Sequence, residues 1–471
     1  MVVGFVVLYL AASIAVGLYA ATRVRGASDY AVAGRRFGTM IVAATVFATW
    51  FGAETVLGIP AAYWKEGLGG VIADPFAALA CLGLIALVFV RPLFRLDVLT
   101  LGDYFRRRYD RASEVLLSLA IAFSYLGWIA AQFVALGLAF NVLSSGAIDM
   151  RAGIVLGAGI VLAYTIAGGM WSVALTDLFQ AAVIVLGLGY VAWSVADMAG
   201  GVERVWREAQ GSGRLRFPAA ADWPAFLGIA ASALTVTLGS VPQQDVFQRI
   251  KSAHDEATAV RATLLGGIVY FAVASVPMFL VAAAAVIDPA LVERLIAKDH
   301  QLILPTLIVE HMPVAVQAVF FGALLSAILS TASGALLAPA VTIAENLLRP
   351  LLPPLDDRAL LRTMRLTVFA LGLAVAAMAL VSRRSIYDLV NDSGKVVLVA
   401  AFVPLAAGLF WPRANARGSL AAIVAGLATW LGAEALAPGG AVPPVLAGFA
   451  ASIAGMVGGS LAPRRRVSAA G

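Results

Sequence analysis

The composition of this 471-residue chain excludes an ordinary soluble protein, because 61% of its residues are apolar and only 13% are charged. Soluble domains have about 45–50% apolar and about 25% charged residues. The net charge of +6 fits either a nucleic-acid-binding protein or the basic cytoplasmic loops of a membrane protein. A single cysteine, Cys81, excludes an intrachain disulfide framework, and the three histidines lack the spacing of a zinc site.

Apolar stretches of about 20 residues, long enough to cross the roughly 30 Å hydrocarbon core of a bilayer, recur along the whole chain. The first stretch lacks the basic region and cleavage site of a signal peptide, so we expect it to be retained. Charged residues and Gly or Pro breaks predict about thirteen spans in one membrane domain, at 2–22, 38–64, 69–90, 113–143, 152–168, 174–197, 223–241, 260–287, 314–346, 363–382, 394–411, 418–437 and 443–462.

Lys and Arg concentrate in alternate short loops, which predicts an outside N-terminus, a cytoplasmic C-terminus and residence in the plasma (inner) membrane. This placement explains the positive charge without nucleic acid. The longest external segments, 198–222 and 288–313, are predicted to be loops or short amphipathic elements. Two charged segments, 106–108 and 249–256, are interpreted as solvated cytoplasmic anchors without a chemical role.

Two spans that lie five apart in the order are interrupted by polar residues, Gly or Pro. The interruptions are Trp50-Phe51-Gly52-Ala53-Glu54 in the second span and residues 239–244 at the end of the seventh. Corresponding interruptions in two halves indicate an inverted-repeat transporter, in which broken helices present backbone carbonyls and helix ends at the membrane centre.

Hydroxyl side chains follow one face of the ninth span. Ser326, Ser330 and Ser333 have i, i+4, i+7 spacing, and Ala327, Ser330 and Thr331 have i, i+3, i+4 spacing. Such residues often bond to carbonyls of their own helix or allow close helix packing. Alternatively, hydroxyls and carbonyls of a neighbouring unwound helix could bind a hard cation such as sodium without a buried fixed charge.

Short motifs along nearly the whole chain resemble the sodium:solute symporter family, whose members carry proline, pantothenate, sialic acid or glucose. Their order and spacing are more specific than any one of them. The motifs are SDYAVAGR at 28–35, LTLGDYF at 99–105, YTIAGGMW at 164–171, TDLFQ at 176–180, QQDVFQR at 243–249 and GLFWPR at 408–413.

The resemblance implies an all-α, leucine-transporter-like fold with a five-plus-five inverted repeat. Spans 2–6 (about 38–197) and 7–11 (about 223–411) would form the repeats, and spans 1, 12 and 13 would be peripheral. It also implies a sodium site made of backbone carbonyls in the second span and a carbonyl and two hydroxyls in the ninth. By motif, these groups belong to Ala48, Phe51, Ala327, Ser330 and Thr331.

Some family members have a second sodium site, which would here use Asp177 and Ser333. The next position is Gly334, where those members have a hydroxyl residue, so the resemblance favours one sodium per cycle. Asp177 could act as an ion relay, or it could cap a cytoplasmic helix start.

Glu54 is a candidate for substrate binding because an unpaired carboxylate inside an apolar span costs about 2.5–3.5 kcal/mol on insertion scales. In the sugar-carrying branch of the family, a glutamate at the matching place contacts substrate. Lys395, predicted to open the eleventh span, could pair with Glu54 or grip the other end of a substrate, or it could extend to the interface. The expected substrate-binding residues are Trp50, Glu54, Gln180, Gln244 and Lys395.

We therefore expect a sodium-coupled secondary transporter, not an enzyme, that imports a small polar solute such as an amino acid, a carboxylate or a sugar by alternating access. No cluster of His, Cys or carboxylate residues suggests an active site, and no protein partner is evident. Two alternatives remain: proton coupling through Glu54, and a membrane sensor of the same fold without net transport.

Overall fold

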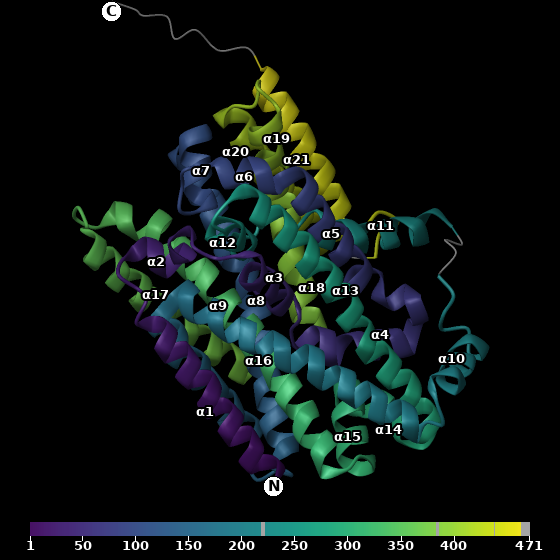
Figure 1. Ribbon diagram of the computed structural model, residues 1–471. Helices are drawn as coiled ribbons and strands as arrows, with labels where there is room; N and C mark the ends of the chain where they lie inside the picture. The colour runs from purple at the N-terminus through teal and green to yellow at the C-terminus, as the bar shows by residue number, and fades with distance from the viewer. Residues whose placement is uncertain (218–221, 383–385, 438, 463–471) are drawn as a thin grey trace, which may run out of the picture.

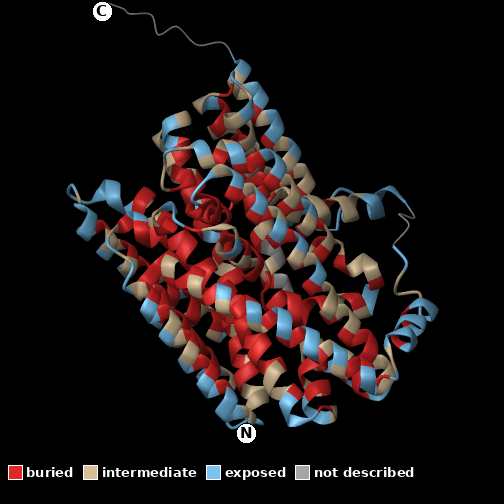
Figure 2. Cartoon of the chain, in the orientation of Figure 1, coloured by how far each residue is buried: buried red, intermediate tan, exposed pale blue. Residues whose placement is uncertain are grey.

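The protein is a helical bundle in the computed structural model, which describes residues 1–471 apart from 218–221, 383–385, 438 and 463–471. The described residues form no strand beyond an isolated bridge between Phe37 and Ala253. The N-terminus lies at the end of the bundle that also holds α14 (Pro289–Lys298) and α15 (Ile303–His311), and α21 (Pro444–Leu461) ends at the opposite end (Figure 1). Buried residues fill the middle of the bundle, and exposed ones follow its outer faces (Figure 2).

Ten helices in the described part of the chain are long and apolar enough to cross a membrane, which agrees with the prediction of a multi-pass protein. One of them, Glu54–Arg95, extends from the second predicted span through the third, and another, α9 (Met150–Met198), covers the fifth and sixth. The helices of uninterrupted single spans are α1 (Val2–Ala21), α8 (Arg111–Leu143), α13 (Glu256–Ile287), α16 (Val314–Thr342), α17 (Asp357–Val381), α20 (Ala416–Leu436) and α21 (Pro444–Leu461).

Both predicted interruptions are confirmed. Helix α3 (Thr39–Trp50) ends at Phe51, whose φ of −90° and ψ of 81° leave the helical region, and a π-helical turn (Glu54–Gly58) leads into α4 (Ile59–Glu66). In the seventh span, α11 (Trp223–Thr237) is separated by turns from α12 (Gln244–Ser252). Two membrane helices are therefore broken where the sequence places Gly, Pro and polar side chains.

A third break lies in α9, between the fifth and sixth predicted spans. Gly169 has φ of 49° and ψ of −133°, a conformation that side-chain-bearing residues rarely adopt. A side chain there would also overlap Tyr30 of α2 (Ala27–Val32). Glycine thus allows the chain to redirect between two spans while packing against α2.

The third and eleventh spans are also irregular. The third contains the π-helical turn Ile72–Ala77, in which Asp74 departs from helical geometry, followed by α5 (Ala78–Leu84), a second π-helical turn (Ile85–Phe89) and α6 (Val90–Arg95). The eleventh consists of α18 (Ile386–Val397), the turn Leu398–Phe402 and α19 (Val403–Phe410). Lys395 therefore lies within α18 and does not open the eleventh span. The prediction placed the start of this span too late because polar residues before Lys395 lower the hydropathy of the first turns.

Short helices connect the spans. Helix α7 (Leu101–Arg108) follows the third span and begins with a capping box between Thr100 and Asp103. The two predicted external segments are partly helical, with α10 (Val202–Gly211) in one and α14 (Pro289–Lys298) and α15 (Ile303–His311) in the other. Helix α16 packs against α1, α3, α8, α9 and α12, so its polar residues lie inside the bundle.

Candidate functional site

The broken end of α3 and the hydroxyl face of α16 meet in the interior. The Ser330 hydroxyl donates to the Ala48 carbonyl at 2.9 Å and to the Ala327 carbonyl at 3.0 Å. The Thr331 hydroxyl donates to the carbonyls of Ala48 at 3.2 Å and Thr49 at 3.1 Å. Each of these residues is fully buried. The structure thus brings together four of the five residues predicted for sodium, and it adds the Thr49 carbonyl, which the sequence did not single out.

Phe51, the fifth predicted residue, is buried where α3 ends, and its N–H donates to the Phe47 carbonyl at 3.0 Å. The donor set suits a hard cation because it consists of neutral oxygens on two separate elements. The hydroxyls of Ser330 and Thr331 can turn their lone pairs toward an ion once their protons rotate away from the carbonyls. Binding there would join the broken helix to α16.

Helices α9 and α16 contribute a second set of buried polar side chains. Asp177 is completely buried, and neither of its carboxylate oxygens has a hydrogen-bond partner in the described structure. It lies well inside the second half of α9, so the alternative in which it caps a helix start is wrong. Ser333 donates to the Ser330 carbonyl at 3.0 Å and lies beside Tyr164, which also neighbours Asp177 and Gln180.

Arg249 adds a buried positive charge near this group. Its side chain, on α12, has 1% exposure, and its guanidinium donates to the Thr49 hydroxyl at 2.9 Å and to the Asp245 carbonyl at 2.9 Å. Lys251, with 2% exposure, donates to the Phe94 carbonyl at 2.9 Å. The interpretation of 249–256 as a solvated anchor is therefore wrong for these two cations, because carbonyl and hydroxyl groups of the protein replace their water.

Glu54 borders a cavity next to the sodium candidates. Its carboxylate accepts hydrogen bonds from Trp128 Nε1 at 3.0 Å and Gln132 Nε2 at 2.8 Å, so both oxygens are oriented by α8. The space between its lining atoms is about 710 Å³ with open solvent included, and the room for the centre of a water-sized molecule is about 90 Å³. Its described lining consists of Trp50, Glu54, Ala73, Asp74, Ala78, Trp128, Thr235, Val236, Ser240, Gln243, Tyr270, Val390, Ser393 and Gly394.

Asp74 is a second carboxylate in this cavity, and it is absent from the residues predicted from the sequence. It accepts a hydrogen bond from the Tyr270 hydroxyl, and the Tyr270 ring meets Trp50 edge to face, with ring centroids 6.1 Å apart. An available signal was the Asp74-Pro75 pair inside an apolar span, since a proline within a helix commonly marks a break. Together with Trp128, these residues surround the space with two acids and three aromatic rings.

Three residues predicted to bind substrate lie away from this cavity. Gln180 belongs to the Asp177 group. The Gln244 side chain accepts from the Leu101 N–H at 3.0 Å, so it holds the start of α7, and the neighbouring Gln243 lines the cavity. Lys395 borders a different cavity, together with Glu434. The predicted contact of Glu54 with Lys395 is not formed, because α8 supplies the Glu54 partners.

Comparisons with known proteins agree with this arrangement. The sequence model of the sodium:solute symporter family matches residues 30–426. The human high affinity choline transporter 1 is 27% identical over 439 residues, which cover 88% of this chain and 73% of the relative. The Escherichia coli (strain K12) sodium/pantothenate symporter is 27% identical over 409 residues, with 85% and 83% covered.

Among solved structures, a Na⁺-coupled sialic acid symporter superposes with a TM-score of 0.83 at 20% identity and covers 98% of both chains. A nucleobase-cation-symport-1 family transporter superposes with a TM-score of 0.61 at 16% identity, covering 90% of this chain and 92% of that one. The predicted leucine-transporter-like fold is therefore confirmed, whereas the boundaries of the two repeats stay a prediction.

Proposed function

Because this chain belongs to the sodium:solute symporter family, we propose that it couples the sodium gradient to uptake of a small organic cation, such as a quaternary or protonated amine. The chain is a transporter and not an enzyme. The observation that carries the choice of solute is the cavity in which Glu54 and Asp74 lie among Trp50, Trp128 and Tyr270.

The charge of this cavity favours a cation over the other solutes expected from the sequence. None of the described lining residues is Lys, Arg or His, so a carboxylate solute would meet two acids without a positive partner. A cation over an aromatic face gains about 0.5–2 kcal/mol or more, depending on how far it is desolvated. Among the matched relatives, the human one is named for choline, a quaternary amine.

Sodium is proposed to bind between α3 and α16, at Ala48, Phe51, Ala327, Ser330 and Thr331. Glu54 follows the same break of the second span, so occupancy of the sodium site and the shape of the cavity depend on one short segment. Sodium would stabilise the arrangement in which the cavity accepts solute. Rearrangement of the bundle would then open both sites to the cytoplasm.

The membrane potential would assist this uptake strongly. Each positive charge that moves inward across a potential of 100 mV, negative inside, gains about 2.3 kcal/mol. One sodium and one monovalent cation would together carry two charges. The proposed orientation has the N-terminus outside and the C-terminus in the cytoplasm. Labelling of single cysteines introduced near both ends would test this orientation.

The decisive experiment is uptake of radiolabelled choline by proteoliposomes that contain the purified protein, with pantothenate, proline and glucose as comparison solutes. We expect choline uptake to require an inward sodium gradient and to increase when a potassium diffusion potential makes the interior negative. Uptake driven by a pH gradient in sodium-free buffer would favour the proton-coupled alternative. Sodium-driven uptake of pantothenate without choline uptake would overturn the proposed solute class while preserving the coupling.

A further inference from the structure

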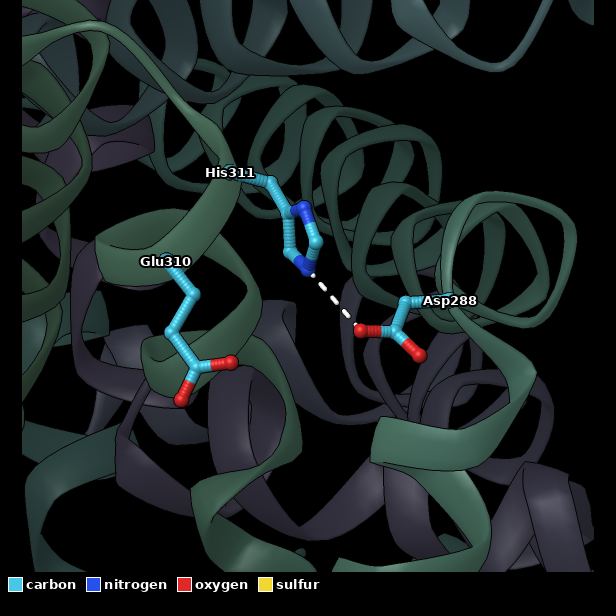
Figure 3. Close-up of side chains that lie close together, drawn as sticks. All are labelled: Asp288, Glu310 and His311. Atoms are coloured by element: carbon cyan, nitrogen blue, oxygen red, sulfur yellow. Dashed lines mark hydrogen bonds and ion pairs between the residues drawn. The ribbon is translucent and has the colours of Figure 1, made fainter.

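Asp288, Glu310 and His311 lie close together at the end of the bundle that holds the N-terminus (Figures 1 and 3). Asp288 connects α13 to α14, and Glu310 and His311 are the last residues of α15. One ligand atom from each side chain lies within 4.8 Å of the other two. No other group of three His, Cys, Asp or Glu residues in the described part of the chain has this proximity.

Two of the three groups already have the separation of metal ligands. His311 Nε2 and Asp288 Oδ2 share a hydrogen bond of 3.0 Å. Two ligands at about 2.0–2.1 Å in a tetrahedral zinc site lie about 3.3 Å apart, so a metal ion that displaces the shared proton needs little movement of either group. The other Asp288 oxygen, Oδ1, accepts the Leu291 N–H at 2.9 Å. This hydrogen bond caps the start of α14 and holds the Asp288 carboxylate in place, so Oδ2 already faces the imidazole of His311.

Glu310 can complete the set by a change of side-chain rotamer. Its side chain is 47% exposed, and its ion pair with Arg294 is 3.6 Å long, beyond the length of a good hydrogen bond. The side chains of Asp288 and His311 are 28% and 30% exposed. An ion can therefore reach all three residues, and a water molecule can occupy a fourth position.

We propose that Asp288, Glu310 and His311 form a binding site for Zn²⁺ or a similar divalent transition-metal ion. An imidazole nitrogen with two carboxylates suits such an ion, whereas calcium and magnesium prefer oxygen ligands alone. His311 binds through Nε2 and carries its proton on Nδ1. The spacing of the histidines predicted no zinc site because the ligands come from two helix ends that are distant in sequence.

A metal at this position ties the start of the α14–α15 segment to its end. This segment packs against α13 and α16, and its turn His300–Leu302 contacts α4 and the π-helical turn that contains Glu54. Bound metal therefore restrains a segment that touches the wall of the Glu54 cavity. Metal binding by these three residues is independent of the proposed transport function.

Isothermal titration of Zn²⁺ into the purified, tag-free protein in chelator-treated buffer tests the site. We expect one ion per chain with micromolar or tighter affinity, and weak binding of Mg²⁺ and Ca²⁺. His311→Ala and Glu310→Gln should each weaken the affinity at least about tenfold, within the range typical of lost metal-site groups. Asp288→Asn should do the same while keeping a side-chain cap for α14.

The matched control is His254→Ala. His254 Nδ1 lies 2.9 Å from Asp255 Oδ2, a comparable His–Asp pair that has no third ligand nearby in the described structure. This variant should bind Zn²⁺ as the wild type does. Absence of Zn²⁺ binding by the wild type, or binding that His311→Ala leaves unchanged while the variant keeps the wild-type melting temperature, would overturn the proposal.

Discussion

The guanidinium of Arg249 occupies the space that a side chain at Gly334 would need. The family resemblance led us to expect a hydroxyl residue at the position of Gly334 in a chain with a second sodium site, and the packed guanidinium gives a structural reason for glycine there. The buried guanidinium also places a fixed positive charge close to the candidate sodium ligands, since it bonds to Thr49, whose carbonyl accepts from Thr331. A second cation at the Gly334 position, which the guanidinium itself fills, would be repelled.

Gly334→Ser should therefore impair transport and should not create a second sodium site. Displacing Arg249 from a packed interior should cost about 1–3 kcal/mol, which corresponds to an increase in the half-saturating sodium concentration of roughly five- to 150-fold when the cost falls on the sodium-bound state. The Hill coefficient for sodium should stay near one in sodium-dependent uptake. Gly159→Ser is the control, because nothing lies near the Gly159 position. A Hill coefficient near two in the Gly334 variant would contradict this account.

Thr331→Ala and Ser330→Ala should each lower the affinity for sodium more than the affinity for solute. Each substitution removes one oxygen from the group shared by α3 and α16, so we expect the half-saturating sodium concentration to rise by about tenfold or more, on the scale of a lost interaction with a charged group. Thr342→Ala serves as the control in the same helix, because the Thr342 hydroxyl donates to the Ala338 carbonyl of its own helix at 3.1 Å. Unchanged sodium dependence in both variants would remove these hydroxyls from the site.

Much of the fold could be predicted because membrane spans depend on local composition. Apolar length located the spans, and Gly, Pro and polar residues located the breaks after Trp50 and Thr237. Helix α18 was predicted to begin too late, since its first turns contain polar residues that lower the hydropathy. The hydroxyl face of α16 was visible in the spacing of its residues, but its contact with the Ala48 carbonyl required the resemblance or the structure.

The cavity was less predictable because its members come from distant elements. The sequence pattern does not distinguish Gln243 from Gln244, although one residue at the start of α12 decides which side chain lines the cavity and which holds α7. Arg249 looked like an ordinary loop cation, since the carbonyl and hydroxyl partners that allow its burial lie on other helices. Lys395 and Glu54 looked complementary in charge, yet packing places them at different cavities.

Glu54→Gln and Asp74→Asn should weaken binding of a cationic solute without preventing insertion of the protein. Each replaces a carboxyl group of the cavity by an amide while preserving side-chain size. A charged hydrogen bond contributes about 1.5–3 kcal/mol, so the KM for choline should rise by roughly ten- to a hundredfold. Glu434→Gln, which changes the acid in the Lys395 cavity, should leave this KM unchanged. An unaltered KM in both cavity variants would argue against recognition of a cation by these acids.

Asn346→Ala should destabilise the protein at the junction of three helical elements. The Asn346 amide donates to Asp103 at 2.8 Å and to Glu114 at 3.0 Å, and its oxygen accepts from the Thr100 hydroxyl at 2.7 Å. Truncation removes one hydrogen bond from each of these three groups, and each buried atom left unsatisfied costs about 1–3 kcal/mol. Thermal unfolding in detergent should show a clearly lower midpoint than for Ser275→Ala, whose hydroxyl bonds only within its own helix. Equal midpoints for the two variants would mean that water or a rearranged neighbour replaces the Asn346 amide, and that this polar junction does not hold α7 and α8 to the end of α16.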